Sequence, residues 1–227
     1  MFPPSTQAVP PPLTWEPIWE WARAHYRDRT FAKDERIPAR PGLLYLVERG
    51  LVRLVGSIEA EPEGPTPAIA NPQEPEASFL GLVGAGQPFE LVAQPPLALQ
   101  AYAHRDQTVV LWLYWHDLDA WPAVRQDVLQ AFRDQHQRKL LWLGILAHRR
   151  TIDRLLGFLM LLMAEHGEPH EHGHCLPFPL THAQIGSAIG STRVTVTRLL
   201  GKLQQKGLLF MENETYICLP APKIQEP

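Results

Sequence analysis

The stretch "LTHAQIGSAIGSTRVTVTRLLGKLQQKGLL" at residues 180–209 has the pattern of two short helices that cross at a tight turn. Gly190 is the predicted turn residue, because glycine adopts positive φ without strain. Gly186 stands where the two helices cross and only a small side chain fits. Ser191 or Thr192 is expected to cap the second helix by accepting hydrogen bonds from its free N–H groups. Together these residues predict a helix-turn-helix.

The second helix of this motif has two faces of different composition. Its buried stripe is predicted to consist of apolar residues at helical spacing, namely Val196, Leu199, Leu200 and Leu203. Arginines that fork onto guanine, and a small apolar group that packs on a thymine methyl, are what a reader of the DNA major groove requires. At about 100° per residue, the opposite face carries such residues. The predicted base-reading residues are Arg193, Val194, Thr197 and Arg198.

The charge around this motif also indicates a negatively charged partner. The chain has a net charge of −3, yet no Asp or Glu occurs between His172 and Met211. A locally cationic stretch in a mildly acidic protein usually faces an anion. Hydroxyls near the helix starts, together with one lysine, suit DNA phosphates. The predicted phosphate contacts are Thr181, Ser191, Thr192, Thr195 and Lys202. The alternative, a solvated helix face, must also explain the glycines, the cap and the missing acids.

Length and composition limit the class of protein. At 227 residues, with 45% apolar residues, the chain is long enough for two domains. Cys175 and Cys218 are far apart in the sequence, which predicts no disulfide framework and is typical of a reducing cytosol. The proline-rich start has no features of a signal peptide. The longest apolar run, at 155–164, is too short to span a bilayer. We therefore expect a cytoplasmic protein that does not insert into membranes.

The chain divides into four predicted segments of an α+β fold. They are a proline-rich tail with a short helix (1–29), an antiparallel β unit (30–120), a long helix (121–148) and a winged helix-turn-helix (149–220). The β unit is expected to contain a hairpin at 42–56 that turns at Gly50, and a proline-rich loop at 57–77. In the last segment, a helix at 151–167 precedes a linker, and the two strands at 207–220 turn at Asn213 and Glu214.

Two heptad seams, apolar at their ends and polar in the middle, run along the predicted long helix. One seam consists of Val124, Val128, Ala131, Gln135, Arg138, Trp142 and Ile145. The other consists of Leu129, Phe132, His136, Lys139, Leu143 and Leu146. The helix is expected either to lie on its own β unit or to form a coiled coil with a second copy, and the pattern leaves both open. For a homodimer, the predicted contacts are Val124, Val128, Ala131, Phe132, Gln135, Trp142 and Ile145.

Residues 180–209 closely resemble the DNA-binding end of the cAMP-receptor/fumarate-nitrate regulator (CRP/FNR) family of bacterial transcription factors. Within the family, "GSTRVTVTRLL" at 190–200 is most similar to the recognition helix of the cyanobacterial nitrogen-regulator branch. The stretch "LAHRRTIDRLLGFLMLLMAEHG" at 146–167 resembles the hinge and following helix of that branch. The resemblance is weaker over 42–118, where "LLYLVERGLVRL" is similar to a β-roll hairpin of the family.

The resemblance implies a homodimer with an N-terminal β-roll, a long dimerisation helix and a C-terminal winged helix. Such a dimer reads a two-fold symmetric operator and acts with RNA polymerase as its partner. Arg193 and Arg198 match base-reading arginines of the family. Val194 replaces a glutamate of the cAMP-type members, which implies a GTA…TAC-like operator.

The effector pocket of the family is altered in this sequence. In "GQPFELVAQ" at 86–94, Glu90 occupies a usual glycine position between Phe89 and Leu91. Leu99 stands where an anion-pairing arginine is expected. The 2-oxoglutarate residues of the nitrogen-regulator branch align with Gln135 and Leu140. We therefore predict that neither cAMP nor 2-oxoglutarate binds in the family manner, and no cofactor is expected.

Three other functions are alternatives to this prediction. The linker holds His170, His172, His174 and Cys175, which are candidate metal ligands of a metal- or redox-responsive regulator, but their spacing matches no closed zinc site. An iron–sulfur sensor needs N-terminal cysteines, and the chain has none before Cys175. A cupin-like metal enzyme needs two histidines one residue apart, whereas His104 and His116 are far apart. The chain is therefore not expected to be an enzyme.

Overall fold

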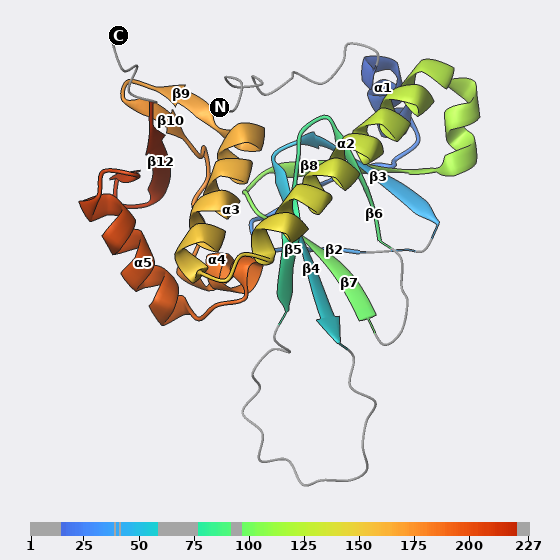
Figure 1. Cartoon of the computed structure of the whole chain (residues 1–227). Helices are drawn as coiled ribbons and strands as arrows, with labels where there is room; N and C mark the ends of the chain where they lie inside the picture. The colour runs from blue at the N-terminus through green and yellow to red at the C-terminus, as the bar shows by residue number, and fades with distance from the viewer. Residues whose placement is uncertain (1–14, 39, 41, 59–76, 92–96, 222–227) are drawn as a thin grey trace, which may run out of the picture. The chain divides into compact units, whose positions relative to one another are not determined.

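The computed structural model describes residues 15–38, 40, 42–58, 77–91 and 97–221. The chain forms two compact units whose boundary lies between Asp134 and Gln135, inside one long helix. This boundary cuts the segment predicted as a separate dimerisation helix. The proline-rich start and residues 59–76 of the predicted loop lie outside the described residues (Figure 1).

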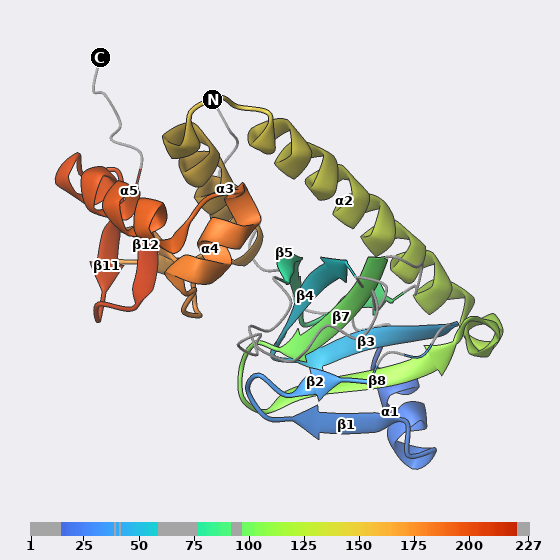
Figure 2. The ribbon, with the colours of Figure 1, turned by 90° about the horizontal axis from the view of Figure 1, so that it is seen from below.

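The first unit contains two four-stranded antiparallel sheets (Figure 2). One sheet has the order β1-β8-β3-β6, and the other has the order β2-β7-β4-β5. The strands are β1 (Asp28–Phe31), β2 (Arg36–Ile37), β3 (Leu43–Arg49), β4 (Leu51–Ile58), β5 (Ser78–Gly84), β6 (Gln87–Glu90), β7 (Leu97–Ala103) and β8 (Thr108–Tyr114).

Strand β3 is buried on both faces, and this divides the core in two. Side chains alternate across a strand, so Tyr45 and Val47 enter one cluster with residues of the second sheet. Leu44 and Leu46 enter a second cluster on the other face. Helix α1 (Glu16–Ala24) and the start of helix α2 (Pro122–Leu146) cover that face. A continuous apolar run is the sequence signature of such a doubly covered strand.

The hairpin predicted at 42–56 is wrong in its pairing. Strands β3 and β4 are joined at Gly50, whose φ is 91°, but they belong to different sheets. A Cβ on Gly50 would lie 2.5 Å from the Thr108 hydroxyl oxygen, so this residue must be glycine for space as well as for φ. The glycine therefore turns the chain from one sheet into the other.

Helix α2 uses one of its two predicted seams within its own chain. Val124 and Val128 are buried in the core of the first unit, so the prediction that they contact a second copy is corrected. In the second unit, the Trp142 ring packs on Phe158 and the Ile145 side chain lies over Gly157. The exposed leucines of this helix are Leu129, Leu140, Leu141 and Leu143. The first seam is thus largely intramolecular.

The second unit is a winged helix-turn-helix. Its elements are α3 (Thr151–His166), β9 (Glu168–His170), β10 (Gly173–Cys175), α4 (His182–Ile189), α5 (Arg193–Gln205), β11 (Phe210–Glu212) and β12 (Tyr216–Pro220). The four strands form one antiparallel sheet in the order β11-β12-β10-β9. The segment predicted as a linker after α3 is therefore a hairpin, β9–β10, that extends the sheet of the wing.

These elements confirm the predicted α+β architecture of a β unit, a long helix and a C-terminal winged helix. In the part of the chain that the structure describes, no helix is long and apolar enough to cross a membrane.

Candidate nucleic-acid interface

The turn between α4 and α5 has the geometry that its residues predict. Gly190 ends α4 in the left-handed conformation, with φ 63° and ψ 53°. A Cβ on Gly186 would lie 2.7 Å from the Ser191 carbonyl oxygen, so a larger residue would push the helices apart. Thr192 is the N-cap of α5, and its Oγ1 accepts a hydrogen bond from the Thr195 N–H at 3.2 Å. Of the two predicted caps, the structure selects Thr192.

Helix α5 separates its buried stripe from its polar face. The predicted stripe is buried throughout, at Val196, Leu199, Leu200 and Leu203. On the opposite face, Arg193, Arg198 and Lys202 are exposed, and Val194 is 79% exposed. Among the described residues, no acid forms an ion pair with these three cations. The exposed Val194 side chain lies among cations that form no ion pair in the described chain, which is typical of a surface that binds a negatively charged partner.

Two of the predicted phosphate-binding hydroxyls also hold the helix starts. Thr181 and Gln184 form a capping box, in which Thr181 Oγ1 accepts from the Gln184 N–H at 3.1 Å. The Thr192 hydroxyl donates to the Thr195 hydroxyl at 3.0 Å. The first-turn N–H groups that the caps leave free, together with the positive end of each helix dipole, favour anion binding.

His182, which the sequence analysis did not select, contacts the predicted base reader Thr197. The Thr197 hydroxyl donates to the Arg193 carbonyl oxygen at 3.0 Å. His182 Nδ1 lies 2.7 Å from the same hydroxyl oxygen. The hydroxyl has one proton for these two contacts, and the tautomer of His182 sets which atom donates between Nδ1 and the hydroxyl. Thr197 is therefore held by α4 as well as by its own helix.

The carbonyl oxygens at the end of α4 are bound by residues from two other helices. Trp142 Nε1 donates to the Ala188 carbonyl oxygen at 3.2 Å, and Arg154 Nε donates to the Ile189 carbonyl oxygen at 3.0 Å. The last carbonyls of a helix have no partner within it. Trp142 and Arg154 supply these partners and hold α4 in place, a role that no local sequence pattern indicates.

The wing turns where the sequence predicts. Asn213 and Glu214 have positive φ values of 49° and 59°, and together with Thr215 they form the three-residue loop between β11 and β12. Glu212 pairs with Tyr216 across this turn.

The prediction that the cysteines form no disulfide is wrong. Cys175 in β10 and Cys218 in β12 are directly opposite in the sheet and are bonded to each other. The neighbouring residues Leu176 and Ile217 form the next pair of the ladder, and the Leu176 N–H donates to the Ile217 carbonyl oxygen. The cysteines therefore occupy a non-hydrogen-bonded pair of the ladder, where side chains are closest. Forty-three residues separate them in the sequence, and only the sheet register brings them together.

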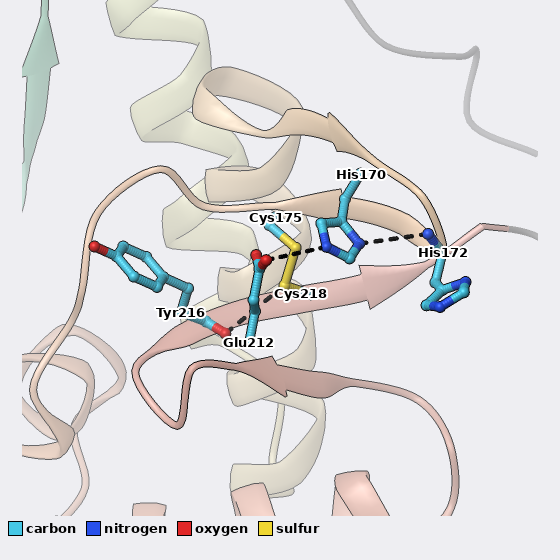
Figure 3. Close-up of a disulfide and its surroundings, with 6 residues drawn as sticks. All are labelled: His170, His172, Cys175, Glu212, Tyr216 and Cys218. Carbon is cyan, nitrogen blue, oxygen red and sulfur yellow. Dashed lines mark hydrogen bonds and ion pairs between the residues drawn. A yellow bond between two sulfur atoms is a disulfide. The ribbon is translucent and has the colours of Figure 1, made fainter.

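The metal-ligand candidates of the former linker separate into two groups. His170 and Cys175 lie together with Glu212 of the wing, and their ligand atoms are all within 4.8 Å of one another (Figure 3). His172 and His174 are outside this group. The structure adds Glu212 to the group and bonds Cys218 to Cys175; both residues are distant in sequence from the histidines and were missed.

The residues of the altered effector pocket belong to both units. Phe89 and Leu91 are buried in the core of the first unit. The Glu90 carboxylate accepts a hydrogen bond from Trp115 Nε1 at 3.5 Å, and Leu99 packs at the edge of the same core. Gln135 and Leu140 lie on the part of α2 that belongs to the second unit. A separate cavity of about 180 Å³ in the first unit is lined by residues such as Arg29, Phe31, Tyr45 and Trp112.

Comparison with known proteins identifies the class of this second unit. Residues 153–223 match the family model of the Crp-like helix-turn-helix domain. The solved structures with a similar fold include FixK2 from Bradyrhizobium japonicum, with a TM-score of 0.64 at 20% identity, covering 85% of this chain and 91% of that chain. A cyclic nucleotide-binding domain containing protein from Listeria monocytogenes has a TM-score of 0.69 at 15% identity, covering 90% of this chain and 97% of that one.

Among curated proteins, the chain is similar to the global nitrogen regulator of Synechococcus elongatus. The two are 39% identical over 93 residues, which is 41% of this chain and 42% of that regulator. Residues 153–223 are therefore a Crp-like helix-turn-helix domain, and the chain has the fold of the CRP/FNR regulators, which confirms the resemblance noted in the sequence. The matched family model is a helix-turn-helix domain, and the curated relative is a nitrogen regulator. Because the chain spans less than half of that curated relative, its activity and partners are proposals.

Proposed function

We propose that this protein is a transcription regulator that binds double-stranded DNA in a sequence-specific manner and acts as a homodimer. The observation that carries the proposal is the exposed face of α5, where Arg193, Val194 and Arg198 project from a capped helix without acidic partners in the described chain. Arg193 and Arg198 have the donors to read guanine, and Val194 has the apolar surface to contact a thymine methyl. Lys202 and the hydroxyls of Thr181, Ser191, Thr192 and Thr195 would contact phosphates.

The homodimer is supported by a stripe of exposed leucines on α2, which includes Leu129 and Leu143 of the second predicted seam. Leu129, Leu140 and Leu143 are 44%, 54% and 62% exposed, and at 100° per residue they fall on one side of the helix. A stripe of this kind is stabilised when it packs on the same stripe of a second copy. Two recognition helices about 34–36 Å apart would then enter successive major grooves of a two-fold symmetric operator.

The operator is proposed to be GTA…TAC-like. This follows from Val194, which an acidic residue replaces in the cAMP-type members, and from the similarity of 190–200 to the nitrogen-regulator branch. RNA polymerase is the proposed protein partner at the promoter, as in the family.

The dimer is proposed to bind DNA without cAMP or 2-oxoglutarate. An anionic ligand needs a cationic partner in its pocket, whereas the corresponding positions here are Glu90 and Leu99. Burial of Phe89 and Leu91 in the core supports the same conclusion. Isothermal titration calorimetry of each ligand is expected to give no heat of binding, and micromolar binding of either would contradict it.

Fluorescence anisotropy with a labelled GTA…TAC duplex tests the proposal as a whole. The full chain is expected to bind in the nanomolar range of specific protein–DNA complexes at physiological salt and to bind a duplex with both half-sites scrambled at least 1,000-fold more weakly, by order of magnitude. Equal affinity for the two duplexes would reject sequence-specific binding. No binding at any salt concentration would instead favour a protein–protein interaction module.

A further inference from the structure

The two disulfide-bonded cysteines and two neighbouring side chains lie on one face of the β11-β12-β10-β9 sheet. The register pairs Cys175 with Cys218, His170 with Gly173, and Glu212 with Tyr216. Directly paired residues share a face, as do residues two apart along a strand. It follows that His170, Cys175, Cys218 and Glu212 all project from the same face, whereas His174 projects from the opposite one.

Gly173 allows the two hairpins to meet over this face. It lies between His170 and Pro220 in the register and has no side chain to fill the space between them. The ring of His170 reaches from β9 to the wing, where its Nε2 lies 3.3 Å from the Glu212 carboxylate (Figure 3). A Cβ on Gly173 would lie 2.0 Å from the Leu219 carbonyl oxygen, so no other residue fits here.

The donor atoms of this face are the types that zinc binds. Structural zinc sites combine cysteine thiolates, histidine nitrogens and carboxylate oxygens, at bond lengths of about 2.0–2.3 Å. Ligand atoms of a tetrahedral site with such bonds are about 3.3–3.8 Å apart. The ligand atoms of His170, Cys175 and Glu212 are already within 4.8 Å of one another. Small side-chain rotations would therefore complete a site.

The sulfur atoms are buried beneath the other two ligands. Cys218 is 0% exposed and Cys175 is 7% exposed, whereas the side chains of His170 and Glu212 are 26% and 41% exposed. An ion could reach the sulfurs from solvent past the imidazole and the carboxylate. The oxidised protein, however, offers only these two outer ligands, because each sulfur is bonded to the other.

We propose that His170, Cys175, Cys218 and Glu212 form a zinc-class metal site that exists only when the disulfide is reduced. A dithiol reductant supplies two electrons and two protons, the bond between the sulfurs breaks to give two thiols, and the dithiol becomes a disulfide. A divalent cation then binds both sulfurs as thiolates and releases their two protons. Oxidation by a disulfide-class oxidant reforms the bond and expels the ion.

Either state joins the β9–β10 hairpin to the wing. In the oxidised state the covalent link runs from β10 to β12. In the metal-bound state, ligands from β9, β10, β11 and β12 would share one ion. Reduction followed by metal binding would therefore replace the disulfide cross-link with a metal cross-link. This inference does not depend on whether the protein binds DNA.

Cobalt titration of the full chain tests the site. The protein is reduced with a phosphine, which takes oxygen from water and leaves two thiols, and is then titrated anaerobically with Co²⁺. We expect one equivalent to bind with a thiolate charge-transfer band and the intense visible bands of tetrahedral cobalt, and Zn²⁺ to abolish both. Oxidised protein is expected to show neither band. Absence of the charge-transfer band from the reduced protein would reject the proposal.

Variants separate this site from adventitious binding by thiols. His170→Gln and Glu212→Gln keep both cysteines. Each variant, once reduced, is expected to bind Co²⁺ more than about 100-fold more weakly than the unchanged chain. Loss of an outer-shell partner alone would weaken binding by about 10–100-fold. His174→Gln, on the opposite face, and Glu214→Gln, in the exposed turn, are the matched controls and should bind as the unchanged chain does. Unaltered binding by both His170→Gln and Glu212→Gln would overturn the assignment.

Discussion

The indole of Trp142 and the main chain of Ala188 are joined by a hydrogen bond, with Nε1 3.2 Å from the carbonyl oxygen. This bond links the C-terminal part of α2 to the end of the first helix of the helix-turn-helix. Trp142 was predicted to contact a second copy of the chain. In the structure its ring packs on Phe158 of its own chain, because the end of α4 needs a donor that its own helix lacks.

Trp142→Phe tests this link. The variant keeps an aromatic ring beside Phe158 but removes the donor to the Ala188 carbonyl. We expect the free energy of unfolding to fall by about 1 kcal/mol, the usual net value of one hydrogen bond, as measured by urea denaturation. An unchanged unfolding midpoint would show that water replaces the indole at no cost.

Gly186→Ala and Gly201→Ala form a matched pair within the helix-turn-helix. The new methyl group at position 186 would lie 2.7 Å from the Ser191 carbonyl oxygen, whereas at position 201 it meets no atom within 4 Å. Overpacking costs about 1–3 kcal/mol, and alanine in an open helical position gains about 0.5–1 kcal/mol over glycine. Thermal unfolding should therefore shift in opposite directions, and a shift of the same sign in both would contradict the crossing geometry.

Arg198→Ala and Lys202→Ala should affect DNA binding in different ways. Loss of a bidentate guanine contact is expected to cost about 1–3 kcal/mol and to relax preference at one operator position. Loss of a phosphate contact should weaken binding to all sequences alike and reduce the salt slope by about 1. Anisotropy titrations over a set of single-base operator variants at several salt concentrations distinguish these outcomes. Intact operator preference in Arg198→Ala would mean that Arg198 does not read a base.

Leu143→Glu is expected to disrupt the proposed homodimer. The charge would enter the exposed stripe of α2, where it would lose its hydration on assembly. Leu141→Glu is the control, because Leu141 is similarly exposed but points about 200° away around the helix. Sedimentation velocity should show a shift toward monomer for Leu143→Glu alone. Dimers of equal stability in both variants would place the interface elsewhere.

Glu165 should make the free energy of unfolding fall as pH rises, whereas carboxylates in ion pairs usually have the opposite effect. Burial raises the pKa of its carboxyl group, against the opposing charges of Arg138 and Lys139, although Arg138 Nε is only 3.1 Å away. A raised folded-state pKa means that stability is fully present below the ordinary glutamate pKa and is lost as pH rises through the raised value. Glu165→Gln should therefore gain in stability relative to the unchanged chain as pH rises above the ordinary glutamate pKa of about 4.3.

Urea denaturation of both proteins at several pH values above the ordinary glutamate pKa measures the difference. Glu171→Gln, which removes an exposed carboxylate, is the control and should follow the unchanged chain. A difference that moves in the opposite direction would show that the ion pair with Arg138 outweighs burial.

The features that were predicted correctly depend on residues close together in the sequence. The turn at Gly190, the small residue at Gly186, the cap at Thr192 and the burial of the α5 stripe are each determined within a few residues. The same holds for the wing turn at Asn213 and Glu214. Local steric limits and helical periodicity act at this range, so one stretch was enough to predict the helix-turn-helix and the face that it presents.

The features that were missed depend on pairing between distant segments. Strand register alone brings Cys175 to Cys218 and Glu212 to His170, since neither spacing follows a metal or disulfide pattern. Likewise, β3 and β4 separate at Gly50, because β3 pairs with β8 and β6 whereas β4 pairs with β7 and β5. The sequence by itself thus determined the exposed face of α5 that is proposed to bind DNA. Only the tertiary structure decided which cysteines, histidine and carboxylate meet, because cross-strand neighbours are set by the whole sheet.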